Sequence, residues 1–109
     1  MRMRTRKFSL DAIKIFRILP TTGESQIIGK QFLRSALSVG ANYRAVCRAR
    51  SKAEFFAKLS ITIEEADEVL FWIDILHDSG IVNHDKFSTF EQDGKEIVAI
   101  LSTARKHTK

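Results

Sequence analysis

Residues 53–77 read AEFFAKLSITIEEADEVLFWIDILH. Apolar side chains recur in this stretch at alternating spacings of three and four residues. They are Phe56, Leu59, Ile63, Ala66, Leu70 and Ile73. Such an alternation places side chains on one face of an α-helix, in the pattern that packs against neighbouring helices at a shallow angle. The stretch therefore predicts a long helix within a helical bundle, and it supplies no chemistry of its own.

The length and composition of the chain are those of a small globular protein. Its 109 residues suffice for one domain with a single core, and 44% of them are hydrophobic and 28% charged. No apolar run approaches the roughly 18 residues of a membrane span. The N-terminus, MRMRTRKF, lacks the apolar stretch of a secretory signal. A single cysteine, Cys47, suits a reducing compartment, so we expect a cytoplasmic protein without membrane contact.

Four helices account for the periodic segments of the chain. They are predicted at about residues 8–19, 24–49, 52–78 and 85–105. No segment alternates with period two for long enough to form a strand. We therefore expect an all-α fold, an antiparallel up-and-down four-helix bundle, in a single domain over residues 1–109.

Capping and breaking residues set the limits of these helices. Pro20 ends the first helix, and Thr22 is expected to cap the second. Ser51 and Glu54 have the spacing of a capping box at the start of the third helix. Ser79-Gly80 then supplies its C-terminal stop.

Charge is divided unevenly along the chain. The whole protein has a formal net charge of +5. Residues 1–52 carry twelve Lys or Arg against two acidic residues, a net +10, whereas residues 53–109 carry six against eleven, a net −5. This polarity indicates a charged partner or charge-matched self-association.

The two middle helices each have a core face and a charged face when side chains are placed about 100° apart. The expected core face of the second helix holds Ile28, Phe32, Ala36, Val39, Tyr43 and Cys47. Its opposite, basic face holds Lys30, Arg34, Arg44 and Arg48, with Leu37 and Ala41 among them. The acidic face of the third helix holds Glu64, Asp67, Glu68, Asp74 and Asp78, with Phe71 and Ile75 among them.

Two interpretations of these charged faces stay open. They are either solvated surface with a few exposed apolar residues, or the two halves of a subunit contact. Because the two faces differ, such a contact would be head-to-tail and could close into a ring, so we expect a cyclic homo-oligomer. The candidate interface residues are Leu37, Ala41, Glu64, Asp67, Glu68, Phe71 and Ile75.

Nucleic-acid binding is the leading specific hypothesis, because Lys and Arg neutralise phosphates and release counterions. The candidate residues are Lys30, Arg34, Arg44, Arg48, Arg50 and Lys52, helped by Arg2, Arg4, Arg6 and Lys7 in an N-terminal arm expected to be mobile. The chain has no base-reading motif, so RNA or single-stranded DNA would be bound without sequence specificity. The same basic face is also a candidate subunit interface, and the two roles are alternatives.

Residues for metal binding or catalysis do not occur in the required spacings. His77, His84 and His107 share no ligand spacing, and Cys47 has no partner cysteine. No serine has a nearby histidine or lies in a strained elbow, and no Gly-rich phosphate loop is present. We therefore expect no metal, no cofactor and no enzymatic activity. His77 and Tyr43 are expected to pack against neighbouring helices.

Several segments resemble one known family. They are QFLRSALSVGANYRAV (31–46), CRARSKAEFFAKL (47–59), EEADEVLFWIDIL (64–76) and GKEIVAILSTARK (94–106). In combination they resemble the bacterial four-helix-bundle family named for proteins encoded in intervening sequences of the 23S ribosomal RNA gene. Many of its members carry an Asn-Ile-Ala-Glu-Gly run where this chain has Asn42-Tyr43-Arg44-Ala45-Val46. Roles of that Glu and Gly therefore do not carry over.

The resemblance implies an antiparallel four-helix bundle that assembles as a homopentameric ring. Accessory proteins of diversity-generating retroelements share this architecture, bind nucleic acid and contact a reverse transcriptase. No catalytic activity is established for the family. The expected function is thus that of a non-enzymatic homo-oligomer that binds RNA or single-stranded DNA. The alternative is a protein-interaction scaffold or accessory subunit without nucleic-acid binding of its own.

Overall fold

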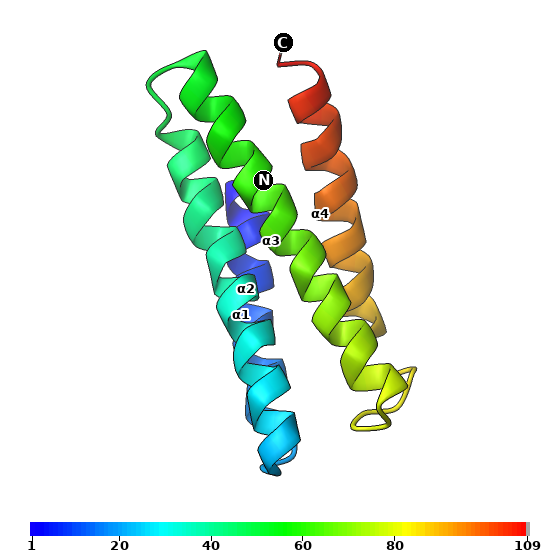
Figure 1. Cartoon of the computed structure of the whole chain (residues 1–109). Helices are drawn as coiled ribbons and strands as arrows, with labels where there is room; N and C mark the ends of the chain where they lie inside the picture. The colour runs from blue at the N-terminus through cyan, green and yellow to red at the C-terminus, as the bar shows by residue number, and fades with distance from the viewer. Residues whose placement is uncertain (109) are drawn as a thin grey trace.

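Four helices form the computed structural model, which describes residues 1–108 (Figure 1). They are α1 (Arg2–Ile18), α2 (Gly23–Cys47), α3 (Lys52–Asp78) and α4 (Ser88–Lys106). They run alternately up and down, each packs against the next in the chain, and the contact between α1 and α4 is the smallest. No strand occurs among the described residues, so the predicted all-α, four-helix fold is confirmed. None of these helices is both long and apolar enough to cross a bilayer.

Aromatic side chains from three helices meet in the core. Phe8 of α1 stacks on Phe90 of α4 with ring centroids 4.3 Å apart, and Phe32 of α2 lies 5.6 Å from Phe90. The third helix completes this core with Ala66 and Ile73, both fully buried. Burial of these apolar surfaces at roughly 25 cal/mol per Å² is the main stabilising contribution to the bundle.

Four of the six residues in the predicted apolar row of α3 are buried. Leu59, Ile63, Ala66 and Ile73 are buried as expected, whereas Phe56 is 42% exposed and Leu70 is half-buried. The expectation for Phe56 was wrong because α3 has 27 residues and α1 only 17, about 40 Å against about 26 Å. The connected ends of α2 and α3 therefore extend beyond the start of α1 (Figure 1).

The first helix begins six residues earlier than predicted, at Arg2 instead of residue 8. Thr5 is 1% exposed, and its hydroxyl donates a hydrogen bond to the Arg2 carbonyl oxygen at 3.0 Å. Met1 also packs against the core. The prediction of a mobile N-terminal arm was therefore wrong, because Thr5 and Met1 continue the core-facing row of α1 among its basic residues.

The remaining helix limits follow their caps. Ser51 Oγ accepts a hydrogen bond from the Glu54 amide at 3.0 Å, and α3 begins at Lys52 as predicted. Gly80 adopts a left-handed conformation (φ 80) just after α3, where its lack of a side chain makes that conformation easy. Thr22 is the N-cap residue of α2, although its side chain makes no capping hydrogen bond. The second helix ends at Cys47, two residues before the predicted limit.

The fourth helix begins at Ser88 rather than residue 85 and ends at Lys106. Phe87, expected inside this helix, is its N-cap and adopts a left-handed conformation (φ 67). The side chain of Phe87 packs against the core, and this contact holds a conformation that is rare for a large residue. The prediction that Phe87 is helical was therefore wrong.

The Ser9 hydroxyl of α1 hydrogen-bonds to the backbone of α2. Ser9 Oγ donates a hydrogen bond to the Ala36 carbonyl oxygen at 2.7 Å and accepts one from the Gly40 amide at 3.2 Å. A Cβ atom at Gly40 would lie 2.6 Å from Ser9 Oγ. A side chain at position 40 would therefore force Ser9 or the helix pair to shift.

We expect Gly40→Ala to lower the free energy of unfolding by about 1–3 kcal/mol, because the added methyl group collides with Ser9 Oγ. Gly23→Ala is the control, since a Cβ atom there has no neighbour within 4 Å, and it should be neutral or slightly stabilising. Chemical denaturation measures both. Adding Ser9→Ala to Gly40→Ala should recover part of the loss; strictly additive effects would contradict the contact.

Ser25 offers a second test of the packing. Its hydroxyl is fully buried in α2 without a hydrogen-bond partner among the described residues. Such a hydroxyl loses its hydration without compensation, so Ser25→Ala should raise the free energy of unfolding by about 1 kcal/mol. Ser35→Ala is the matched control, because Ser35 is equally buried but donates to the Gln31 and Phe32 carbonyl oxygens. A stabilisation of equal size at both serines would contradict this explanation.

Candidate functional site

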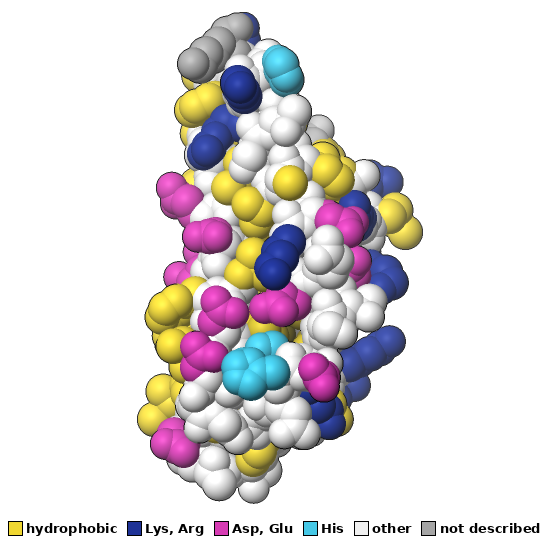
Figure 2. Space-filling view, turned by 90° about the vertical axis from the view of Figure 1, so that its right-hand side faces the viewer, with side chains coloured by type: hydrophobic (Ala, Val, Ile, Leu, Met, Phe, Trp, Pro, Cys, Tyr) yellow, Lys and Arg dark blue, Asp and Glu magenta, His cyan; other side chains and the backbone are white. Residues whose placement is uncertain are grey.

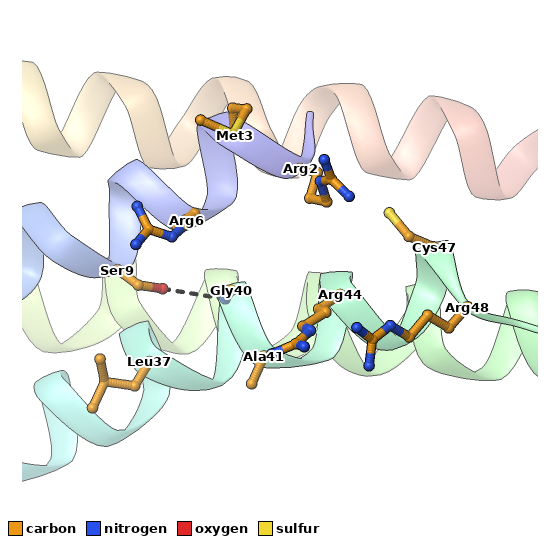
Figure 3. A pocket seen from close by; sticks show the side chains of 10 residues that line it. All are labelled: Arg2, Met3, Arg6, Ser9, Leu37, Gly40, Ala41, Arg44, Cys47 and Arg48. Carbon is orange, nitrogen blue, oxygen red and sulfur yellow. Dashed lines mark hydrogen bonds between the residues drawn. The ribbon is translucent and has the colours of Figure 1, made fainter.

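A hollow of about 580 Å³ lies between the N-terminal half of α1 and the C-terminal half of α2 (Figure 3). We call it the arginine groove. It is lined by Arg2, Met3, Arg6, Ser9, Leu37, Gly40, Ala41, Arg44, Cys47 and Arg48. No carboxylate is among these residues, so the lining is strongly positive.

Two pairs of arginines provide the charge of the groove. Arg2 and Arg6 are one turn apart on α1, and Arg44 in the last turn of α2 lies four residues before its C-cap, Arg48, so each pair projects from one side of its helix (Figure 3). All four are exposed, and none has an ion pair or hydrogen bond to another side chain within residues 1–108. Four guanidinium groups are therefore available to an anionic ligand.

The hollow shape follows from small residues at the contact of the two helices. Ser9, Gly40 and Ala41 fill little space where α1 and α2 meet, and the Ser9–Gly40 hydrogen bond holds the backbones together (Figure 3). The longer side chains stand on either side of this floor. The groove thus depends on the same contact that fixes the helix pair.

Apolar side chains also reach the groove surface. Leu37 is 41% exposed and Met3 is 69% exposed. Cys47 is exposed as well, so its predicted place in the core was wrong. The reason is that α1 does not extend beyond Arg2, which leaves the last turn of α2 uncovered on this side. The groove therefore combines cationic groups with exposed apolar surface.

The predicted phosphate-binding residues divide into two groups. Arg44 and Arg48 line the groove, whereas Lys30, Arg34, Arg50 and Lys52 lie outside it. Arg34 contacts the carboxylates of Glu65, at 3.1 Å, and Glu68 of the same chain. Arg50 lies 3.9 Å from Glu54, and Lys52 is the first residue of α3.

Basic and acidic side chains of α2 and α3 thus meet within one molecule at Arg34. Trp72 Nε1 donates a hydrogen bond to Glu68 at 3.3 Å, so Glu68 is shared between Arg34 and Trp72. Within residues 1–108, Glu68 is the candidate interface residue that forms an ion pair. Two other candidate interface residues, Leu37 and Ala41, line the arginine groove.

Sequence reasoning did not identify Met3, Ser9 and Gly40 as parts of the site. One sequence pattern could have shown that the first helix begins earlier than predicted. Met1, Thr5 and Phe8 have helical spacing and continue the buried row of α1 toward the N-terminus. With that helix extended, Arg2 and Arg6 fall on one face. The Ser9–Gly40 contact has no comparable signal, because it joins residues 31 positions apart.

A second charged surface lies on the outer side of α3. We call it the acidic face, made of Glu64, Asp67, Phe71, Asp74 and Ile75. Phe71 is 53% exposed and meets Trp72 edge-on, with ring centroids 5.0 Å apart, while Ile75 is half-buried. The three carboxylates have no ion pair or hydrogen bond to residues of the described chain. Figure 2 shows acidic side chains with hydrophobic ones among them on one side of the molecule, and Lys and Arg at the opposite edge.

The remaining titratable residues form no further centre. Within residues 1–108, no three His, Cys, Asp or Glu side chains lie close enough to share a metal ion. His77 is buried, and its Nε2 lies 2.9 Å from the Lys86 carbonyl oxygen, so it packs as predicted. Tyr43 packs against the core, where burial raises its pKa, with a smaller effect from Cys47.

An ion pair holds the start of α1 on α4. Arg4 donates a hydrogen bond to Glu96 Oε1 at 2.6 Å and lies 3.8 Å from Asp93. The hydrogen bond from Arg4, helped by one from Gln92, lowers the pKa of the Glu96 carboxyl group. Arg4 therefore fixes the turn of α1 that carries Arg2 and Arg6.

Replacing Arg4 tests this attachment. We expect Arg4→Gln to raise the pKa of Glu96 toward its ordinary value, as followed by a carboxyl NMR titration. Because the folded-state pKa is lowered, the ion pair stabilises the protein above the ordinary pKa and loses this effect as the pH falls through the lowered value. Lys7→Gln is the control, since Lys7 pairs with Asp11 at 2.7 Å. An unchanged Glu96 titration in Arg4→Gln would show that the contact is absent in solution.

Comparisons with known proteins agree with this fold. Residues 1–103 match the model of the 23S rRNA-intervening sequence protein family. A solved structure, of a protein of unknown function from the S23 ribosomal protein family of Bacteroides thetaiotaomicron, is 28% identical, with a TM-score of 0.89 over 96% of this chain and 94% of that one. No protein of curated function matches. The predicted resemblance is confirmed, and the chain belongs to the 23S rRNA-intervening sequence protein family.

Proposed function

We propose that this protein is a non-enzymatic, self-associating helical bundle that binds RNA or single-stranded DNA without sequence specificity. The observation that carries the proposal is the arginine groove, where four exposed arginines without ion-pair partners in the described chain converge from two helices. Phosphate groups are the ligands that such a cluster binds best, because each contact releases condensed counterions.

The apolar part of the groove favours a single strand over a duplex. Leu37 and Met3 offer exposed surface beside the arginines. An unpaired strand can lay its bases on apolar side chains and on the planes of guanidinium groups, whereas a duplex keeps its bases stacked inside. The groove thus fits both parts of an unpaired strand.

The chemistry of the groove supports binding rather than catalysis. Its lining contains no histidine and no carboxylate that could transfer a proton. The Ser9 hydroxyl is already committed to Ala36 and Gly40. The family description names 23S rRNA, which makes RNA the first strand to test.

Charge reversal in the groove tests the proposal. Arg44→Glu combined with Arg48→Glu should abolish binding of a fluorescently labelled ten-nucleotide RNA at moderate salt, as measured by fluorescence anisotropy. For the unchanged protein, the logarithm of the binding constant should fall as the logarithm of the salt concentration rises. The slope should be no steeper than about −3, because each of four neutralised phosphates contributes roughly −0.7. The matched control is Lys14→Glu with Lys95→Glu, which changes the net charge equally on exposed residues outside the groove.

Equal loss of binding in both charge-reversed proteins would show that only net charge matters, and it would remove the groove from the proposal. Circular dichroism of each variant establishes that the bundle stays folded.

The second candidate is a protein-interaction scaffold without nucleic-acid binding of its own. Phe71 favours it: this side chain is exposed on α3 among carboxylates that have no ion pair within residues 1–108, and an aromatic side chain within a charged patch is typical of a docking surface. Under either function we propose self-association, with the cyclic pentamer as the form that the family resemblance implies. An RNA-independent assembly together with no RNA retention at any salt concentration would favour the scaffold.

A further inference from the structure

The contact between α1 and α2 fixes where each arginine lies along the groove. The Ser9 hydroxyl bonds both the Ala36 carbonyl oxygen and the Gly40 amide, so Ser9 lies level with the middle of the turn of α2 between these two residues. The two helices run in opposite directions from this contact (Figure 1). The helical rise of about 1.5 Å per residue then gives the distance of each arginine from it.

Two arginines from opposite walls lie at the same level of the groove. Counted from the contact, Arg6 lies about 5 Å along the groove and Arg2 about 10 Å, both on the wall formed by α1. On the wall formed by α2, Arg44 lies about 9 Å along the groove and Arg48 about 15 Å. Figure 3 shows the same order, with Arg2 and Arg44 between Arg6 and Arg48. The four guanidinium groups therefore occupy three levels, and the middle level has two of them.

The backbone of Arg2 is held in place although it is the first residue of α1. Its carbonyl oxygen accepts a hydrogen bond from the Thr5 hydroxyl at 3.0 Å, and Thr5 is 1% exposed. Two residues further on, Arg4 donates a hydrogen bond to Glu96 of α4 at 2.6 Å. Arg44 lies in the last turn of α2. Both sides of the middle level are therefore positioned by ordered helix.

The distance between levels matches one kind of anion. Successive levels are about 5 Å apart, because one helical turn separates the two arginines on each wall. Neighbouring phosphates along an extended single strand have a comparable separation, whereas two phosphates that share a bridging oxygen lie much closer together. The spacing therefore favours a phosphodiester strand over a diphosphate.

We infer that the groove holds three consecutive phosphates of a single strand, with the middle phosphate clamped between Arg2 and Arg44 and the two flanking phosphates at Arg6 and Arg48. The inference rests on the proposed function for its ligand and adds the length and register of the bound segment. Guanidinium groups bind phosphate oxygens in a bidentate manner, so two of them can hold one phosphate from opposite sides.

Three phosphates define a bound segment of four nucleotides. The salt dependence should then have a slope of about −2, because each neutralised phosphate of a single strand contributes roughly −0.7. A strand longer than four nucleotides adds no further contact in this groove. It gains affinity only through the larger number of equivalent positions at which it can bind.

The length of the segment is tested with oligouridylates that lack terminal phosphates. Oligomers of two, three, four and six nucleotides compete with the labelled ten-nucleotide RNA in the fluorescence anisotropy measurement. We expect affinity to rise steeply from two to four nucleotides and to change little beyond four. An equally steep rise from four to six nucleotides, or full affinity at two, would overturn the three-phosphate register.

The clamp is tested by a double-mutant cycle with the same RNA. Arg2→Gln and Arg44→Gln should each weaken binding roughly tenfold, because each removes a charged hydrogen-bond donor. Together they should weaken it less than the product of the single effects, by at least about threefold, because either change loosens the phosphate that both arginines hold.

Arg6→Gln with Arg48→Gln is the matched control, since it removes the same charge from the same groove. These two arginines contact different phosphates, so their combined effect should equal the product of the single effects within about twofold. Circular dichroism checks that each variant stays folded. Equal coupling in both pairs, or coupling in neither pair, would overturn the clamp.

Failure of the proposed function gives a different result. If no RNA binds at any salt concentration, the strand register fails with it, but the clamp is still tested with inorganic phosphate at low ionic strength. The Nε–H signals of Arg2 and Arg44 in an NMR titration should then shift at lower phosphate concentrations than those of Arg6 and Arg48. Equal shifts of all four signals would overturn the clamp.

Discussion

The Ser9 hydroxyl, placed between the Ala36 carbonyl and the Gly40 amide, is the contact on which the rest of the site depends. It links two backbones at a position where one added carbon on Gly40 would collide with it. The shape and charge of the groove follow from this contact. The long side chains lie on either side of it, and four of the side chains that line the hollow between them are arginines.

Electrostatics then divides the molecule into two kinds of surface. Where basic and acidic helices adjoin, at Arg34, they neutralise each other within the chain. Within residues 1–108, the guanidinium groups of the groove and the three carboxylates on the outer side of α3 have no such ion-pair partner. Such a division costs little while both surfaces are hydrated, and it favours any ligand that supplies the missing charge. A polynucleotide does so for the groove.

Most of the helices and many of the buried residues could be predicted from the sequence, and each wrong prediction has a physical reason. The spacing of Leu59, Ala66 and Ile73 and the Ser51 cap are local signals, so α3 was predicted to the residue. Phe56 and Cys47 were misplaced because periodicity shows which face is apolar but not how far a neighbouring helix extends along it. Phe87 was misplaced because a tertiary contact, rather than local preference, holds its backbone.

The charged residues also show that periodicity alone does not predict which neighbouring helix a side chain meets. Arg34 and Arg44 lie on one predicted face, yet Arg34 meets carboxylates of α3 and Arg44 lines the groove. Only the packing of the helices distinguishes them.

The position of Cys47 has a practical consequence. It is the chain's one thiol and it stands at the rim of the hollow, so a maleimide dye attached to the natural sequence would sense whichever occupant enters. The protein thus carries its own attachment point for a spectroscopic probe.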